Sequence, residues 1–129
     1  MIQTAIHEAK HKVDEYELPD QRLNLDRETS AYLTAAIFSP CPFNGLHSAI
    51  EQIRGFRQNV NAQNLNNIFH KLNNLARISL AKDYTHEQLR TELRTIYADY
   101  RTISGNTPFV DLTNFENYVV PAIYQAFEK

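Results

Sequence analysis

The fold class is decided by residues 85–106, THEQLRTELRTIYADYRTISGN, which contain a complete amphipathic helix with its start and stop signals. Thr85 and Gln88 have the form of a capping box, and Ser104-Gly105-Asn106 closes the pattern. Between them, apolar residues recur every three or four positions, which places them on one helical face. They are Leu89, Leu93, Ile96, Tyr97, Tyr100 and Ile103. We therefore expect a helix with one buried stripe, and an arginine face in solvent at Arg90, Arg94 and Arg101.

The same spacing continues on both sides of this segment. It predicts helices over residues 2–17, 26–38, 44–60, 62–81 and 113–127. The pattern around Asn59 to Asn64 leaves open whether the third and fourth of these are separate or one continuous helix. Asp26 and Asn44 are expected to cap two of them, and Thr113 with Glu116 repeats the capping box before a kink at Pro121. Tyr118 and Phe127 fall on the apolar stripe of the last helix and are expected in the core, with Tyr97 and Tyr100. The sequence thus predicts an all-α bundle of five or six helices.

Composition supports one compact domain over residues 1–129. The chain is 43% hydrophobic, carries a net charge of -2 and has a single cysteine. This charge gives no electrostatic footprint for nucleic acid or an anionic membrane, and no run of 18 apolar residues occurs. The lone Cys41 needs no oxidising compartment. We expect a cytoplasmic protein without cofactor whose partner is another protein, and whose helices near 62–81 and 85–104 form a central antiparallel hairpin.

The first motif that could carry chemistry is His7-Glu8-Ala9-Lys10-His11. It matches H-E-x-x-H and resembles the zincin family over these five residues, which implies two zinc ligands and a glutamate base. Only six residues precede it, no strand is evident, and Lys10 places a cation inside it. Helical spacing puts His7, His11 and Asp14 opposite the apolar stripe of Ile2, Ala5, Ile6 and Ala9. We expect a solvated polar face and no zinc hydrolase, with His7 and His11 as the remaining metal candidates.

The second motif is Phe69-His70-Lys71-Leu72-Asn73-Asn74-Leu75. On a helical wheel His70 lies about 160° from the centre of the neighbouring apolar stripe, so its ring is expected to face solvent. The segment resembles the H-box of histidine-kinase dimerisation and histidine phosphotransfer domains, over roughly residues 62–104. The resemblance implies a four-helix bundle with His70 as phosphoacceptor. It also implies that Asn73 and Asn74 orient or donate hydrogen bonds, and that Lys71 and Arg77 screen the phosphoryl charge.

The segment departs from the pattern of that family in several ways, one of which is that the proline that often follows the box is absent. Lys71 stands where many histidine kinases have an acidic residue, and Asn73-Asn74 replaces the Lys-Gly pair of stand-alone phosphotransfer domains. No glycine-rich nucleotide lid follows, so kinase activity is not expected. The remaining hypothesis is a phosphotransfer intermediate or a related adaptor, with a response regulator as partner.

A different class of function fits the same composition, namely an immunity or antitoxin-type inhibitor that occludes a toxin or enzyme. Acidic residues gather in the first part of the chain and could oppose a basic partner; they are Asp14, Glu15, Glu17, Asp20, Asp26 and Glu28. A relay protein should depend on His70, whereas an inhibitor should tolerate its replacement. Cys41, six residues before His47, is a third and weaker candidate, because no further catalytic partner can be assigned to it.

Overall fold

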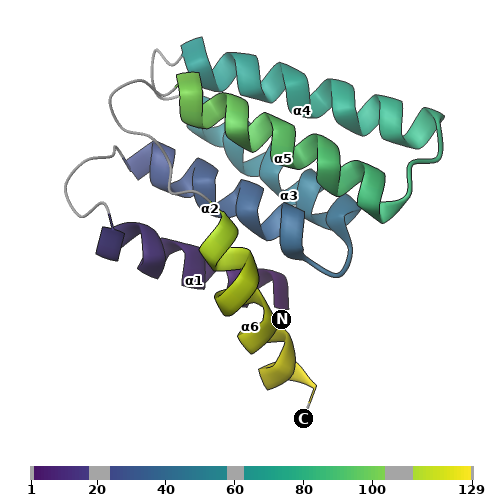
Figure 1. Cartoon of the computed structure of the whole chain (residues 1–129). Helices are drawn as coiled ribbons and strands as arrows, with labels where there is room; N and C mark the ends of the chain where they lie inside the picture. The colour runs from purple at the N-terminus through teal and green to yellow at the C-terminus, as the bar shows by residue number, and fades with distance from the viewer. Residues whose placement is uncertain (1, 18–23, 58–62, 104–111, 129) are drawn as a thin grey trace.

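The structure is a computed structural model that describes residues 2–17, 24–57, 63–103 and 112–128. These residues form helices and no strand. The helices are α1 (Ile2–Glu17), α2 (Asn24–Phe38), α3 (Pro42–Arg57), α4 (Gln63–Ala81), α5 (His86–Ile103) and α6 (Val120–Phe127), with a π-helical turn at Phe115–Val119 before the last (Figure 1). The all-α prediction is confirmed. The expected helix continuation at 58–60 lies outside the described residues.

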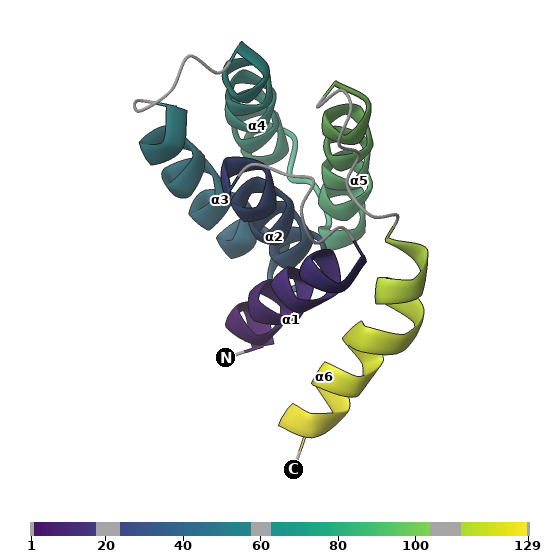
Figure 2. The same ribbon diagram turned by 90° about the vertical axis from the view of Figure 1, so that its left-hand side faces the viewer.

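Four of the helices form a ring. Helices α2, α3, α4 and α5 each contact the next, and α5 contacts α2 again. Helix α1 packs on α2, and α6 lies along α1 with its C-terminal end pointing away from the ring (Figure 2). The α4–α5 hairpin is antiparallel as expected, but it is not the centre of the bundle. The central helix is α2, because it contacts α1, α3 and α5 and its small and apolar side chains are buried almost all round.

The start of α5 follows its local sequence closely. The Thr85 amide donates to the Gln88 side chain over 2.8 Å, and the Gln88 amide donates to Thr85 Oγ1 over 3.1 Å. The predicted capping box is therefore confirmed. The start of α3 was predicted wrongly, since the helix begins at Pro42 rather than after Asn44. Proline is well suited to a first helical turn, where its missing N–H is not needed.

The C-terminal segment differs from the prediction in two ways. Glu116, expected in the second capping box, accepts from Arg94 of α5 with both carboxylate oxygens at 2.8 and 2.9 Å, and its amide donates to the carbonyl of Leu112 at 2.8 Å. A wide π-helical turn also precedes Pro121, which cannot donate a backbone hydrogen bond. Tyr118 and Phe127 are exposed rather than in the core, at 73% and 48%. The C-terminal segment packs on the core through Val119, Val120, Ile123 and Tyr124, and the rings of Tyr118 and Phe127 lie outside this contact.

Arg90 of α5, expected on a solvated face, is largely buried and holds the end of α2. Arg90 Nε donates to the carbonyl of Ile37 at 3.0 Å, and its Nη2 donates to the carbonyl of Ser39 at 2.8 Å. The hydroxyl of Tyr124 donates to the carbonyl between them, that of Phe38. The last carbonyls of a helix have no intrahelical partner, so these side chains supply what the end of α2 lacks. The side chain of Arg101 lies outside the described residues.

Helix α1 contains a buried ion pair. The Lys10 ammonium binds the Asp14 carboxylate one turn later, and both side chains are fully buried. Ser30 Oγ donates to Asp14 at 3.2 Å, and the hydroxyl of Tyr97 lies 3.4 Å from Ser30 Oγ. The expected solvated position of Asp14 is therefore wrong. The physical reason is that Ser30 of α2 and Tyr97 of α5 reach this side of α1, so its buried surface extends beyond the apolar stripe.

Within the described ranges, no helix combines the length and the hydropathy needed to cross a bilayer.

Candidate functional site

The outward surface of α4 carries the predicted phosphoacceptor. We define the α4 outer face by four exposed residues, His70, Asn74, Arg77 and Ile78. Residues three, four, seven and eight positions apart share one side of a helix, so these four form a continuous stripe. Ile68 and Leu72, on the opposite side, are fully buried. The expected exposure of His70 is confirmed.

The polar groups expected around His70 are only partly brought together. Asn74 and Arg77 are hydrogen-bonded to each other, Nη2 to Oδ1, at 2.7 Å. Asn73 is partly buried and lies at the edge of the face. Lys71 points across to α5, where its ammonium binds the Asp99 carboxylate at 3.0 Å. The cationic charge next to His70 is thus largely balanced by an aspartate that the sequence did not mark.

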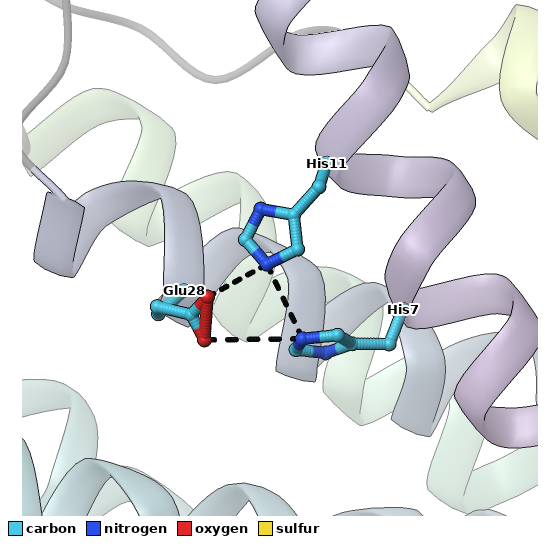
Figure 3. Close-up of side chains that lie close together, drawn as sticks. All are labelled: His7, His11 and Glu28. Atoms are coloured by element: carbon cyan, nitrogen blue, oxygen red, sulfur yellow. Dashed lines mark hydrogen bonds and ion pairs between the residues drawn. The ribbon is translucent and has the colours of Figure 1, made fainter.

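A second cluster joins α1 to α2 (Figure 3). Nε2 of His7 and Nε2 of His11 lie 3.2 Å apart on successive turns of α1. Glu28 of α2 reaches the pair, with one oxygen 2.7 Å from His11 Nε2 and the other 3.8 Å from His7 Nε2. One ligand atom from each residue falls within 4.8 Å of the others. These three groups could hold a metal ion.

Burial is the main influence on the pKa of His7. Desolvation, and then the proximity of His11, lower the pKa of His7 below its ordinary 6.5, and the Glu28 and Glu8 carboxylates oppose this shift. The lowered pKa favours the neutral form of the His7 imidazole. The ring of Tyr32 lies against that of His7, with centroids 4.3 Å apart. Burial, followed by the nearby carboxylates, raises the pKa of the Tyr32 hydroxyl.

The predicted solvated position of His7 and His11 is wrong, because both rings are largely buried against α2. The four-residue spacing of the histidines was visible, but Glu28 was noted only as one of several acidic residues. Because Glu28 comes from another helix, its place depends on how α1 packs on α2. No local pattern indicates that packing.

The remaining candidates do not assemble. Cys41 is a free, partly buried thiol in the α2–α3 connection, and its own carbonyl accepts a hydrogen bond from Ser39 Oγ. His47 is exposed on α3.

Comparison with known proteins gives no relative from which a role could be carried over. No family model, no curated protein and no solved structure matches the chain.

Proposed function

We propose that this protein is a small helical interaction module that acts through the α4 outer face, and that it relays a phosphoryl group through His70. The observation that carries the proposal is the exposed imidazole on the outside of a helix within a ring of four helices. A phosphoacceptor must enter the active site of its partner, so it has to project from a rigid surface. His70 meets this requirement.

The neighbours of His70 suit a phosphoryl group moderately well. Asn74 and Arg77 lie one and two turns further along the same face, and an amide and a guanidinium both donate hydrogen bonds to phosphoryl oxygens. Lys71 contributes less than the resemblance implies, because it is paired with Asp99. The exposed Ile78 adds an apolar contact for a protein partner. The face therefore offers donors and one apolar side chain rather than a strongly cationic patch.

The proposed step transfers a phosphoryl group between a partner aspartate and His70. The bond between phosphorus and the aspartyl oxygen breaks, and a bond between phosphorus and an imidazole nitrogen forms. The aspartate leaves as a carboxylate, and the ring proton passes to solvent. The reverse transfer restores the neutral imidazole, so the protein needs no nucleotide of its own.

The test is phosphorylation of the full chain with acetyl phosphate and with phosphorylated response regulators. We expect label on the wild type that is lost in acid and stable in alkali, and no label on His70→Gln. His47→Gln is the matched control, since His47 is another exposed histidine on a neighbouring helix. Absence of label with every donor, or equal labelling of His70→Gln, would overturn the relay.

An occluding inhibitor is the second candidate, favoured by exposed apolar side chains. Leu80 at the end of α4 is 71% exposed, and Tyr118 is also uncovered. The acidic surface expected to oppose a basic partner lacks two of its residues, because Asp14 is buried and Glu28 faces the two histidines. An inhibitor should keep its partner in His70→Gln and lose it in Leu80→Asp. A relay should show the opposite dependence on His70.

A further inference from the structure

The cluster between α1 and α2 contains none of the residues of the α4 outer face. We propose that His7, His11 and Glu28 form a binding site for one divalent transition-metal ion of the zinc class. Two imidazole nitrogens and one carboxylate oxygen are a common zinc ligand set, and they discriminate against Mg²⁺ and Ca²⁺, which prefer oxygen ligands only.

The spacing of the ligand atoms agrees with such an ion. A tetrahedral metal with bonds of about 2.0–2.2 Å sets its ligand atoms roughly 3.3 Å apart. The two Nε2 atoms lie 3.2 Å apart, and Glu28 lies 3.8 Å from His7. The third distance, 2.7 Å between His11 and Glu28, is that of a hydrogen bond, which the metal would replace. Rotation of the Glu28 side chain is sufficient to open it.

Hydrogen bonds alone satisfy the cluster poorly. Nε2 of His11 faces both Nε2 of His7 and a Glu28 oxygen, and it carries one proton at most. If His11 Nε2–H donates its hydrogen bond to Glu28, it cannot also donate a linear hydrogen bond to His7. If His7 supplies a proton instead, the lone pair of His11 is left against the carboxylate. A cation between the three groups accepts all of their lone pairs at once.

The surroundings hold the ligands in place. The ring of Tyr32 packs on that of His7 and limits its rotation. Lys10 lies inside the same five-residue motif, but its ammonium is bound to the buried Asp14 and does not compete with a metal. The three ligand side chains are 13–25% exposed, and a cavity of about 200 Å³ borders His7. The partial exposure of all three side chains leaves room for water to complete the coordination of an ion.

Because the ligands come from two helices, the ion should also join them. Binding to the folded state alone stabilises a protein by mass action. At an ion concentration 100-fold above the dissociation constant, the melting temperature should rise by about 10 °C. His7 Nδ1 is buried without a hydrogen-bond partner. A partner at this position ordinarily strengthens a metal site 10- to 100-fold, so we expect the affinity to be moderate.

The experiment uses the full chain, stripped with a chelator and titrated separately with Zn²⁺, Co²⁺ and Mg²⁺. We expect one Zn²⁺ per chain by calorimetry, visible Co²⁺ bands of the intensity that tetrahedral sites give, and no heat with Mg²⁺. His11→Gln and Glu28→Gln should each weaken Zn²⁺ binding at least 10-fold. His47→Gln, which removes an exposed histidine from α3, should bind like the wild type.

Folding of each variant is checked without metal by circular dichroism and by its melting curve. If the wild type binds no Zn²⁺, the site does not exist. If Zn²⁺ binds equally to His11→Gln, Glu28→Gln and the wild type, the ion is held elsewhere and the assignment is wrong. A Zn²⁺-dependent rise in melting temperature that both folded variants lose would establish the site. None of these readouts involves phosphorylation, so the relay through His70 stands or falls separately.

Discussion

The ammonium of Lys10 and the carboxylate of Asp14 form an ion pair inside the protein, one helical turn apart and out of contact with solvent. Asp14 also accepts a hydrogen bond from Ser30, whose oxygen lies 3.4 Å from the Tyr97 hydroxyl. The pair thus links α1 to α2 and α5 through polar groups. Such a pair is costly to break, because either partner alone would be a buried, unbalanced charge.

Replacing Asp14 with Ala should therefore destabilise the fold by about 3–5 kcal/mol. The double variant Lys10→Met/Asp14→Leu removes both charges and should recover most of that loss. Urea unfolding followed by circular dichroism measures both. A cost below about 1 kcal/mol for Asp14→Ala would show that the pair is not held in a desolvated interior.

The approach of α2 and α3 gives a prediction with an internal control. A Cβ atom added at Gly45 would meet Ala36 Cα at 2.5 Å, whereas one added at Gly55 meets nothing within 4 Å. Gly45→Ala should force the helices apart and cost about 1–3 kcal/mol. Gly55→Ala should instead stabilise α3 by about 0.5–1 kcal/mol, because alanine is the better helix former. Melting temperatures that move in the same direction for both variants would contradict this packing.

The elements predicted correctly are those whose signals are local. The capping box at Thr85 and Gln88 and the stripe that follows it require only neighbouring residues, and α5 forms as expected. The exposure of His70 was predictable for the same reason, since its face of α4 is opposite to the buried stripe. Local signals were sufficient wherever one side of a helix meets the core and the other meets solvent.

The errors arise where two distant segments cover one helix. Apolar residues alone suggested which side of α1 is buried, but Ser30 of α2 and Tyr97 of α5 also reach Lys10 and Asp14, which are buried. The same packing brings Glu28 to the histidine pair. Arg90 was read as a surface residue because its partners are backbone carbonyls on another helix, and a sequence pattern does not show these. The candidate metal site was thus visible only in part, as two histidines without their third ligand.

The capped end of α2 should contribute measurably to stability. Arg90 donates to two carbonyls there, and its side chain is mostly buried. Arg90→Met keeps the aliphatic contact but leaves these carbonyls without a partner, and should cost about 2–3 kcal/mol. Arg77→Met, at an exposed position on α4, should change stability by less than about 0.5 kcal/mol. Equal midpoints for the two variants in urea would show that the carbonyls find water instead.

The pair of Arg94 and Glu116 should make stability depend on pH. The hydrogen bond from Arg94, more than its charge, lowers the pKa of Glu116 from the ordinary 4.5, while burial opposes the shift. A carboxyl group with a lowered folded-state pKa stabilises the fold above its unfolded pKa, and this contribution is lost as the pH falls through the folded value. Glu116→Gln should therefore be less stable than the wild type at pH 7. The difference should close between about pH 5 and pH 3.

The expected difference at pH 7 is below about 1 kcal/mol, because both side chains are partly exposed and solvent screens them. Melting curves of the wild type and Glu116→Gln across this range measure it, and 1 M salt should reduce it further. Arg94→Met removes the other partner of the pair. The double variant Arg94→Met/Glu116→Gln should show the same pH dependence of stability as Glu116→Gln alone. A wild-type advantage that stayed constant down to pH 3 would mean that the Glu116 carboxylate is not the source of the effect.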